Sequence, residues 1–433
     1  MNDSVTKNKG VRPRVVITGG GFSGLWAAKT LANQPVDVVL VDRNNYHTFL
    51  PLLYQVAAAE LEPEDIAYPI RSILRKYTNV RFVLADIKKI DLDKRILYSA
   101  DYAISYDYLI LATGSATQFF GTPGAAEYSF QLKTLEQGIT LRNHVLRCFE
   151  YASRKIDDAK RQQLLTFTIV GGGPTGVEFA GALAELIHGP LKKDYPSIDF
   201  DYVNVILIEA ANSVLLSFPK MLRDYALDRL YRMKVNVMLE TLVEKVTPLT
   251  VHLKDKDILP TQTVVWTAGV CANPIASTWG LSATRNGLLM VLPTLEAEGR
   301  QEIYVIGDLS SMEENRRQLP MTAPVAVQQG VQAAKNILGK LKGKPASPFV
   351  YKDRGAMVTI GRNTAVAQIG KKSFTGFFAW LLWLIVHLIN LIGFRNRLMV
   401  LINWSMDYLL FERAIRLILP SRKPPMTRKK NQT

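Results

Sequence analysis

Short apolar runs that end in glycine-rich turns occur twice along the chain, each followed by a stretch of small residues. Residues 14–20 read RVVITGG and continue as GFSGLWAAKTLA, whereas residues 165–171 read LTFTIVG and continue as GGPTGVEFAGALAEL. A continuous apolar run of this length, bounded by turn residues, is typical of a strand buried inside a parallel sheet. The hydrophobic pattern therefore predicts two strand–turn–helix units of the same design.

The glycines of the first unit have the spacing of a dinucleotide-binding turn. Gly19, Gly21 and Gly24 form GxGxxG between strand and helix, and the next apolar run, VDVVLVD, ends at Asp42. The first glycine permits the tight turn, the second lets a pyrophosphate approach the backbone, and the third lets helix and strand pack closely. A carboxylate at the end of the second strand suits the ribose hydroxyls. These residues predict a nucleotide pocket.

The second unit repeats this plan with a longer interval before its acid. Gly171, Gly173 and Gly176 form the turn, and the strand VNVILIE ends at Glu209. The extra length falls in HGPLKKDYPSIDFDY, whose prolines predict an inserted loop. Glu209 should repel a 2′-phosphate, so NADH is favoured over NADPH, although the two lysines of the inserted loop leave some use of NADPH open.

Further strand ends complete the pockets. YDYLILATGS places Thr113 and Gly114 after a strand, and QEIYVIGDLS places Gly307 and Asp308 after another. In the second unit, TVVWTAGV is likewise a strand that ends in a turn of small residues. The doubled arrangement resembles the two-dinucleotide-binding-domain flavoproteins of the glutathione-reductase-like superfamily. The resemblance implies FAD in the first pocket, NADH in the second, and a hydrogen bond between Asp308 and the ribityl chain of FAD; the alternative for Asp308 is a capped strand end.

The predicted fold is accordingly an α/β fold with two Rossmann-like dinucleotide-binding domains and a C-terminal membrane-anchoring helical region. The predicted boundaries are 12–125 and 291–345 for the FAD-binding domain, 126–290 for the NADH-binding domain, and 346–433 for the anchoring region with its basic tail. Two nucleotides in one chain make chemical sense, because hydride passes from a nicotinamide to a flavin only at near-contact distance.

The segment after Asp42 excludes one class of flavoprotein. Disulfide reductases carry a cysteine pair here, but this chain reads RNNYHTFLPLLYQVAAAEL, and its two cysteines, Cys148 and Cys271, lie far from this segment and from each other. A thiol relay is therefore excluded, and neither a disulfide scaffold nor a zinc site is expected. The five histidines are scattered, so no metal site is predicted.

Four stretches together resemble one family. NYHTFLPLLYQVA, GGGPTGVEFAG, APVAVQQG and the C-terminal GFRNRLMVLINW are similar to type II NADH dehydrogenases, the single-subunit NADH:quinone oxidoreductases, and the likeness runs over about residues 12–412. The resemblance implies a peripheral membrane flavoenzyme that reduces a lipid-soluble quinone with NADH and pumps no protons. The apolar C-terminal run carries no carboxylate, so no intramembrane proton relay is visible there.

The resemblance also implies roles for two further side chains. Glu178, placed on the first turn of the second unit's helix, matches a glutamate near the nicotinamide that orients NADH or relays a proton; the alternative is charge stabilisation of the helix N-terminus. Gln328 in APVAVQQG matches a quinone contact, and a structural place on the helix face is its alternative. Pro324 and Leu50 stand where the family pattern has glutamine, which leaves the choice of quinone open.

The last fifth of the chain is both basic and apolar. Residues 351–433 hold 14 Lys/Arg and 3 Asp/Glu and so carry most of the net charge of +15, and they include the uncharged run Phe374 to Phe394. Basic residues around an apolar helix are typical of a membrane surface rather than of nucleic acid. Two half-immersed helices are expected, with their tryptophans in the interfacial zone; one membrane span is the alternative.

Location, assembly and rival activities complete the predictions. The polar N-terminus lacks the apolar stretch of a secretory signal, so attachment at the cytosolic face is expected, and a homodimer is left open. The rival readings are a sulfide:quinone reductase, a biosynthetic naphthoquinone reductase and a non-catalytic NADH-sensing flavoprotein. A sulfide:quinone reductase needs cysteines beside the flavin, which Cys148 and Cys271 do not supply by number or position.

Overall fold

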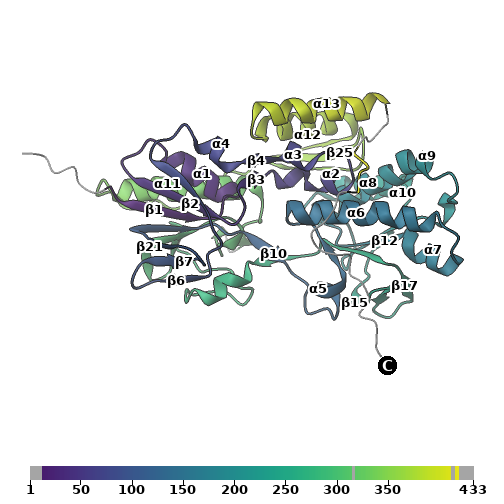
Figure 1. The fold of residues 1–433 in the computed structure, drawn as a ribbon, viewed down its shortest axis with the longest axis horizontal. Helices are drawn as coiled ribbons and strands as arrows, with labels where there is room; N and C mark the ends of the chain where they lie inside the picture. Colours follow the sequence, from purple (N-terminus) through teal and green to yellow (C-terminus); the bar gives the residue numbers. More distant parts are fainter. Residues whose placement is uncertain (1–11, 315–316, 411–414, 419–433) are drawn as a thin grey trace, which may run out of the picture. The chain divides into compact units, whose positions relative to one another are not determined.

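The computed structural model describes residues 12–314, 317–410 and 415–418, which belong to two compact units (Figure 1). Unit 1 draws on Met1–His47, Tyr68–Ala116 and Val270–Arg354, and unit 2 draws on Thr48–Ala67, Thr117–Gly269 and Gly355–Thr433. The short strands β3 (Tyr46–Thr48), β4 (Ala67–Pro69) and β10 (Ser115–Thr117) lie where the chain passes from one unit to the other.

Unit 1 is built on a six-stranded sheet in the order β20-β21-β9-β1-β2-β5. The strands are β1 (Arg14–Thr18), β2 (Asp37–Asp42), β5 (Val80–Leu84), β9 (Tyr108–Leu111), β20 (Glu296–Ala297) and β21 (Arg300–Val305). All neighbours run parallel except β20, which pairs antiparallel with β21. The helices α1 (Phe22–Leu31) and α11 (Ala323–Lys340) pack against each other. In a Rossmann fold the first strand lies inside the sheet, as β1 does here, so this sheet has the predicted arrangement.

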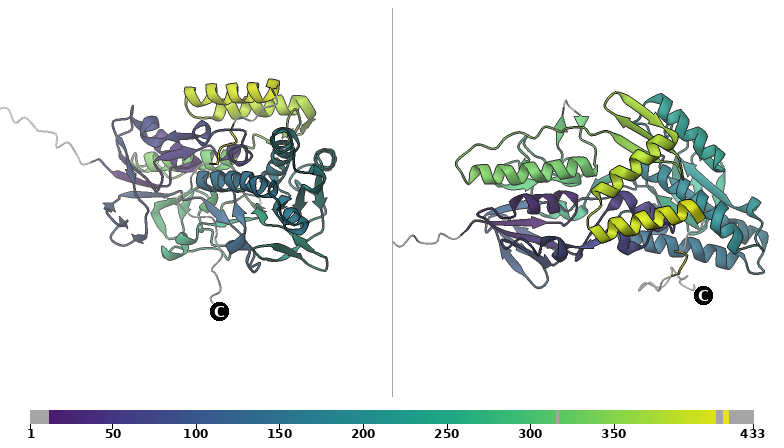
Figure 2. Two further views of the ribbon diagram at one scale, coloured as in Figure 1. Left: turned by 45° about the vertical axis from the view of Figure 1, so that its right-hand side comes forward. Right: turned by 90° about the horizontal axis from the view of Figure 1, so that it is seen from above.

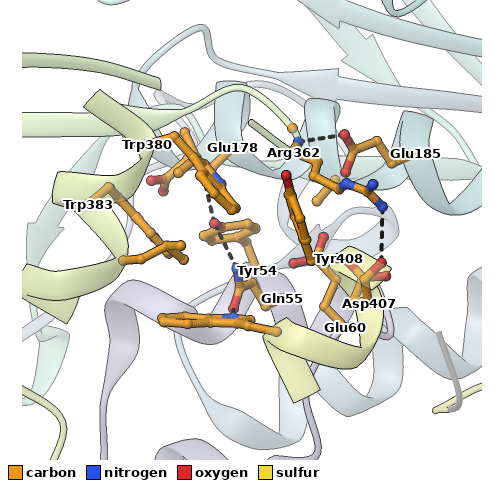
Figure 3. A pocket seen from close by; sticks show the side chains of 15 residues that line it. Tyr54, Gln55, Glu60, Glu178, Glu185, Arg362, Trp380, Trp383, Asp407 and Tyr408 are labelled. Atoms are coloured by element: carbon orange, nitrogen blue, oxygen red, sulfur yellow. Dashed lines mark hydrogen bonds between the residues drawn. The ribbon is translucent and has the colours of Figure 1, made fainter. Parts of the chain in front are cut away.

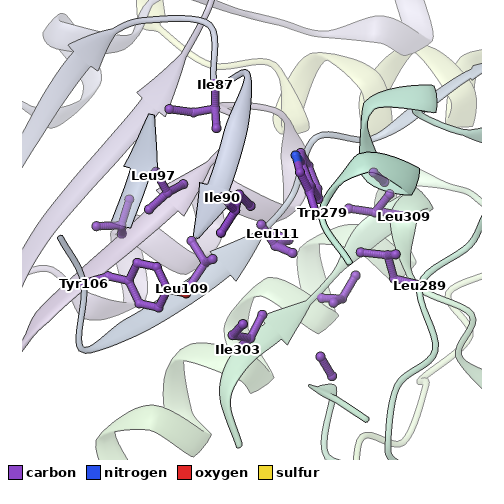
Figure 4. Packing of buried hydrophobic residues seen from close by; sticks show 14 of the residues in the cluster. Ile87, Ile90, Leu97, Tyr106, Leu109, Leu111, Trp279, Leu289, Ile303 and Leu309 are labelled. Carbon is purple, nitrogen blue, oxygen red and sulfur yellow. The ribbon is translucent and has the colours of Figure 1, made fainter. Parts of the chain in front are cut away.

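A second layer of unit 1 packs against this sheet. It contains the antiparallel strands β6 (Lys89–Asp91), β7 (Ile96–Tyr98) and β8 (Ala103–Ser105), and the short elements β19 (Val270–Ala272), η4 (Pro274–Thr278) and η5 (Gly307–Leu309). Leu97, Leu109, Trp279, Leu289 and Ile303 pack together in its core (Figure 4). The remaining elements are α4 (Ile70–Leu74), β22 (Glu313–Glu314) and β23 (Arg317–Gln318).

Unit 2 contains a five-stranded parallel sheet in the order β11-β18-β12-β13-β14. Its strands are β11 (Phe130–Gln131), β12 (Thr166–Val170), β13 (Asn204–Ile208), β14 (Val235–Met238) and β18 (Thr263–Trp266). The helices of this unit's first part are α2 (Leu53–Ala57), α3 (Pro63–Ile66), α5 (Ala125–Tyr128), α6 (Leu135–Ala152), α7 (Asp158–Leu165), α8 (Pro174–Leu186) and α10 (Lys220–Arg232), with the turn η1 (Leu50–Leu52). Both Rossmann sheets predicted from the sequence are thus confirmed.

Two smaller sheets extend unit 2. The strands β15 (Val243–Val246), β16 (Thr250–Leu253) and β17 (Ile258–Pro260) form an antiparallel sheet, as do β24 (Ala356–Thr359), β25 (Ala365–Ile369) and β26 (Lys372–Thr375). Two C-terminal helices, α12 (Gly376–Asn390) and α13 (Phe394–Leu410), follow and contact each other, as the two views of Figure 2 show in yellow-green and yellow. Within the described part of the chain, no helix combines the length and apolarity needed to cross a membrane.

The structure differs from the sequence predictions at two local points. The loop predicted after the second Rossmann helix is partly helical, because α8 continues into a π-helical turn, η2 (Ile187–Leu191), that accommodates Pro190, and then into α9 (Lys192–Asp194) and η3 (Phe200–Tyr202). The compact units also place residues 48–67 and 355–410 with the second Rossmann sheet. The boundaries given above for the FAD-binding, NADH-binding and anchoring regions stay predictions.

Candidate active site

The turn after β1 leaves no room for a side chain at its two ends. Gly19 has a φ of +102°, and a β-carbon there would overlap the carbonyl oxygen of Ala112. A β-carbon on Gly24 would overlap the carbonyl oxygen of Gly19, because α1 starts directly against the strand. Between them, Gly21 has no atom within 4 Å of the place a β-carbon would take. The turn therefore presents open space beside exposed backbone, which fits a pyrophosphate.

Asp42 fastens this turn as well as closing the strand. Its Oδ2 accepts a hydrogen bond from the backbone N–H of Gly20 at 2.6 Å, and its Oδ1 accepts one from Asn44 at 2.7 Å. Burial raises the pKa of Asp42, and these two backbone donors act in the opposite direction. The predicted ribose ligand thus also holds the turn that would carry the phosphates.

The second pocket reproduces the first at each of these points. Gly171 has a φ of +110°, and a β-carbon on Gly176 would overlap the carbonyl oxygen of Gly171. Glu209 accepts hydrogen bonds from the backbone N–H of Gly172 at 2.6 Å and of Ala211 at 2.9 Å. Gly173, like its counterpart in unit 1, has nothing within 4 Å of a β-carbon position. Both predicted dinucleotide turns therefore have the same construction.

The strand ends of unit 1 fit the remaining parts of an FAD molecule. Thr113 carries a buried hydroxyl with no hydrogen-bond partner among the described residues, and Gly114 beside it has a φ of +70° with open space around it. Asp308 accepts a hydrogen bond from the Ser115 hydroxyl at 2.7 Å. An unpartnered hydroxyl, open backbone and an acid facing a strand end suit a polar cofactor chain, so the residues present fit the cofactor.

Gln328 and its neighbour Gln329 are held differently on α11. The Gln328 amide donates to the carbonyl oxygen of Lys352 and accepts from the Lys352 N–H, both at 3.0 Å. Gln329 is buried and accepts a hydrogen bond from the backbone N–H of Gly307 at 2.6 Å. The engagement of Gln328 with backbone favours its helix-face alternative, and its quinone contact stays a prediction. Gln329 lies in the same motif but was not among the predicted site residues.

Glu178 lies on the second turn of α8, not on the first as the sequence analysis had it. The helix begins at Pro174, and its first turn contains no acid. A carboxylate this far along the helix lies beyond the range at which the N-terminal dipole stabilises it. The alternative role of Glu178, helix N-terminal charge stabilisation, therefore loses its structural basis.

The Glu178 side chain is half-buried. Burial raises its pKa to about 8, and the nearby Glu60 adds to this, whereas the backbone N–H of Thr359 and the indole of Trp383 lower it. The indole nitrogen of Trp383 makes no hydrogen bond of ordinary geometry within the described residues, so Thr359 is the stronger donor. Below pH 8, Glu178 is therefore mainly a neutral acid that holds a transferable proton.

Glu178 borders a cavity of about 40 Å³ inside unit 2 (Figure 3). Its aromatic lining consists of Tyr54, Trp380, Trp383, Trp404 and Tyr408, and its charged lining consists of Glu60, Glu178, Glu185, Arg362 and Asp407. One bound water needs roughly 10–15 Å³ of such space, so the cavity has room for more than one. The three tryptophans that were expected in the interfacial zone of a membrane line this cavity; Trp383 is only 1% exposed, whereas Trp380 and Trp404 are half-buried.

A series of hydrogen bonds forms one side of the cavity. The indole N–H of Trp404 donates to Oε1 of Gln55 at 3.0 Å, and Nε2 of Gln55 donates to the Tyr54 hydroxyl at 3.2 Å. The Tyr54 hydroxyl and Oγ1 of Thr359 share a further hydrogen bond of 2.8 Å, in which either group can be the donor. These hydrogen bonds connect α13 and α2 to Thr359 at the end of β24, whose backbone N–H donates to Glu178. Tyr54, Gln55 and Thr359 were not among the predicted site residues.

The outward faces of α12 and α13 are apolar and exposed. On α12 the exposed large apolar side chains are Phe377, Phe378, Leu381, Ile385 and Ile389, and on α13 they are Phe394, Leu398, Leu401, Ile402, Met406 and Leu409, beside the exposed Tyr408. Their spacing of three or four residues puts each set on one side of its helix. Exposed Lys371, Lys372, Arg395 and Arg397 lie at the ends of the two helices. We refer to these apolar side chains together as the outer apolar face.

Comparisons with known proteins agree over nearly the whole chain. Residues 13–330 match the pyridine nucleotide-disulphide oxidoreductase family, and residues 354–414 match the NDH2 C-terminal domain. The type II NADH:quinone oxidoreductase Ndh of Mycobacterium tuberculosis is 39% identical over 92% of this chain and 88% of its own length. The type II NADH:quinone oxidoreductase of Staphylococcus haemolyticus is 31% identical over 84% of this chain and 92% of its own length.

Solved structures show the same fold. NDH2 from Plasmodium falciparum in complex with NADH superposes with a TM-score of 0.88, covering 95% of this chain and all of that one, at 19% identity. A sulfide:quinone oxidoreductase from Aquifex aeolicus superposes less closely, with a TM-score of 0.73 at 18% identity and with 92% and 95% of the two chains covered. At these identities the likenesses concern the fold, whereas the relatives above share sequence over most of their length. The chain therefore belongs to the type II NADH:quinone oxidoreductase family.

Proposed function

We propose that this chain oxidises NADH and passes two electrons through FAD to a lipid-soluble quinone, without pumping protons. The observation that carries the proposal is the pair of identically built dinucleotide turns in a member of this family, each closed by its own acid. Bound FAD supplies the two-electron chemistry. The protein's part is to bind, to orient and to supply protons, and the following residues are assigned to those tasks.

The glycine turns bind the two cofactors by backbone. In unit 1 the N–H groups around Gly21 receive the pyrophosphate of FAD, Asp42 its ribose, and Asp308 its ribityl chain. In unit 2 the turn at Gly173 receives the pyrophosphate of NADH, and Glu209 receives its ribose. Support comes from the open space at both middle glycines and from the acids that already lie against each turn.

Glu178 is assigned as the acid that gives a proton during quinone reduction. It is neutral at pH 7, it borders a cavity with room for water, and Thr359 fixes its position. A carboxylic acid with a pKa near the working pH is well matched to proton transfer in both directions. Gln328 was the other predicted reacting residue, and the engagement of its amide with Lys352 makes it the weaker candidate.

The outer apolar face is assigned to a membrane, as a monotopic attachment on the cytosolic side. A helix that is apolar all round is normally covered on every side, yet protein covers only one side of α12. Basic residues at the ends of both helices suit anionic headgroups. We assign this face to lipid rather than to a second copy of the chain because of that charge, and because a lipid-soluble quinone has to be met in lipid.

The test is purification followed by anaerobic mixing with NADH and then with a panel of quinones. The protein is expected to carry a flavin absorbance that NADH bleaches and that a lipid-soluble quinone restores. A colourless protein, or a flavin that NADH leaves unchanged, would overturn the proposal. A flavin that NADH reduces but no quinone reoxidises would instead support the NADH-sensing alternative.

The positions of the two cysteines argue against the alternative of a sulfide:quinone reductase. Cys148 is buried in the core of unit 2 beside His144 and Thr263, and burial raises the pKa of its thiol to about 12, so it is not a nucleophile at neutral pH. Cys271 lies in unit 1, where its thiol contacts the carbonyl oxygen of Ala116. Neither residue meets a second cysteine, so a thiol-based mechanism has no pair to use.

The assignment of Glu209 predicts a change in coenzyme preference. In Glu209→Gln the amide oxygen can still accept from Gly172, but the charge that repels a 2′-phosphate is gone. The ratio of kcat/KM for NADH over NADPH should therefore fall about tenfold, which corresponds to ~1.4 kcal/mol. The measurement is steady-state turnover with both coenzymes, and Glu244→Gln, an exposed acid on β15, is the control. An unchanged ratio would remove Glu209 from the ribose site.

A further inference from the structure

Proton balance requires a supply from water in every turnover. Oxidation of NADH to NAD⁺ releases two electrons and one proton, whereas reduction of a quinone to the quinol consumes two electrons and two protons. One proton per turnover therefore comes from solvent. If Glu178 gives that proton, its carboxylate has to regain one before the next cycle.

The cavity joins Glu178 to a second carboxyl group, that of Glu60. Glu60 follows α2, is partly exposed, and lines the same cavity (Figure 3). Its position is held by an unusual backbone: Ala59 before it is fully buried and has a φ of +57°, in the left-handed region that L-residues with a side chain rarely adopt, and the Glu60 N–H donates to the carbonyl oxygen of Gln55. Strained backbone that the surrounding structure retains is common at functional sites.

The two carboxyl groups influence each other across the cavity. The charge of Glu60 raises the pKa of Glu178 and that of the buried Tyr54 hydroxyl. Both groups line the same cavity, so the charge of one acts on the other across it. With space for more than one water in the cavity, a proton can pass from one carboxyl group to the other without direct contact.

The other polar groups of the cavity are committed elsewhere. The Tyr54 hydroxyl accepts from Gln55 and shares a hydrogen bond with the Thr359 hydroxyl, and burial raises its pKa well above the ordinary value, so it gives up no proton near neutral pH. Glu185 accepts a hydrogen bond from the backbone N–H of Arg362 at 2.5 Å. Arg362 donates to the carbonyl oxygen of Asp407 and its guanidinium lies over the Tyr408 ring. Asp407 lies on α13 at the far side of this group from Glu178 in Figure 3.

We propose that Glu60 is the outer proton-relay residue that returns a proton from solvent to Glu178 through the cavity. This inference rests on the proposed function, and specifically on Glu178 as the acid. In each turnover Glu178 loses its proton to the reduced quinone, Glu60 passes one proton to the Glu178 carboxylate, and Glu60 regains a proton from water. Glu60 acts through Glu178 and touches no substrate, so it is a relay and positioning residue.

The test is Glu60→Gln in the full-length flavoprotein, read out in two half-reactions. Anaerobic reduction of the flavin by NADH should stay within about twofold of wild type, because no solvent proton is taken up there. Quinone turnover should fall about tenfold at pH 8. Its pH dependence should also change: with the relay removed, turnover should begin to drop at a lower pH than in wild type, whose turnover should drop only above about pH 8.

Chemical rescue separates a relay from a structural role. Azide is a small weak acid that can carry protons into a narrow cavity, so millimolar sodium azide should restore turnover of Glu60→Gln in proportion to its concentration and leave wild type unchanged. Glu60→Asp keeps the acid and should stay within about threefold of wild type. Glu64→Gln is the matched control, since Glu64 is an exposed acid on the neighbouring α3 that does not line the cavity.

The outcomes distinguish the relay from the proposed function beneath it. If Glu178→Gln is slow but Glu60→Gln keeps the wild-type pH profile and ignores azide, the relay is wrong and the role of Glu178 stands. If Glu178→Gln itself turns over at the wild-type rate, the assignment of Glu178 fails and the relay fails with it. If Glu60→Gln loses its flavin, Glu60→Asp and the azide response of Glu60→Ala decide the question instead.

Discussion

Replacing Glu178 by glutamine should slow quinone reduction about a hundredfold, the lower end of what a positioned acid contributes. The amide can still accept a hydrogen bond from Thr359 but has no proton to give. Reduction of the flavin by NADH should change far less. Wild-type turnover should itself fall as the pH rises through about 8, because Glu178 then loses its proton, and the variant should lack this transition.

The same substitution should stabilise the fold. Between pH 4.5 and 8 the unfolded chain has an ionised Glu178 and the folded chain has a neutral one, so folding takes up a proton and stability falls as the pH rises. Glutamine has no such penalty. At pH 7 the gain is on the order of 3 kcal/mol as an upper bound, and near pH 4.5 it vanishes. A thermal melt of both proteins at the two pH values measures the difference.

These two effects have to appear together. A variant that is slow and less stable than wild type at pH 7 would indicate that the substitution damaged the site rather than removed a proton donor. A variant that turns over normally would show that the proton reaches the quinone by another route. Glu64→Gln, which changes an exposed carboxylate outside the cavity, should leave both turnover and melting temperature unchanged.

Four substitutions on the outer apolar face should release the protein from membranes. Phe378, Ile389, Phe394 and Leu409 are 78%, 64%, 82% and 77% exposed, so replacing them by serine removes little packing from the fold. Each loses roughly 1–2 kcal/mol of burial in lipid, and together they should weaken partition into lipid vesicles about a thousandfold. Vesicle flotation measures the binding, and a water-soluble electron acceptor should show unchanged turnover.

The matched control removes exposed apolar side chains elsewhere. Leu216, Met221, Leu242 and Val350 are also exposed, but none lies on α12 or α13. Changing these four to serine should leave vesicle binding as it is. If both variants bind equally well, the attachment lies outside the outer apolar face, and the assignment of that face to lipid is wrong.

The dinucleotide turns could be predicted because their information is local. Gly19, Gly24 and Asp42 lie within one βαβ unit, and the spacing that the turn requires is written directly in the chain. The structure adds that each acid accepts from the backbone of its own turn, and that this construction repeats in unit 2. The family resemblance extended the prediction to the activity, which the relatives support.

The cavity around Glu178 could not be predicted because its parts come from distant segments. Tyr54, Thr359 and Trp404 meet only after the C-terminal sheet and helices have packed against α2 and α8. The apolar run of α12 gave no sign of which side faces inward, since both sides are apolar. The tryptophans were therefore assigned to a membrane interface. Glu178 was predicted on the first turn of its helix but lies on the second, because the helix begins at Pro174.

The order of the elements along the chain has a consequence for biosynthesis, because α12 and α13 follow both Rossmann sheets. The ribosome makes both Rossmann sheets long before it makes the two helices that enclose Glu178. Until residues near Tyr408 emerge, that glutamate faces bulk water and holds the ordinary acidity of a surface carboxylate. A nascent chain can therefore complete its nucleotide turns early, whereas the proton chemistry becomes available only after α12 and α13 have been translated.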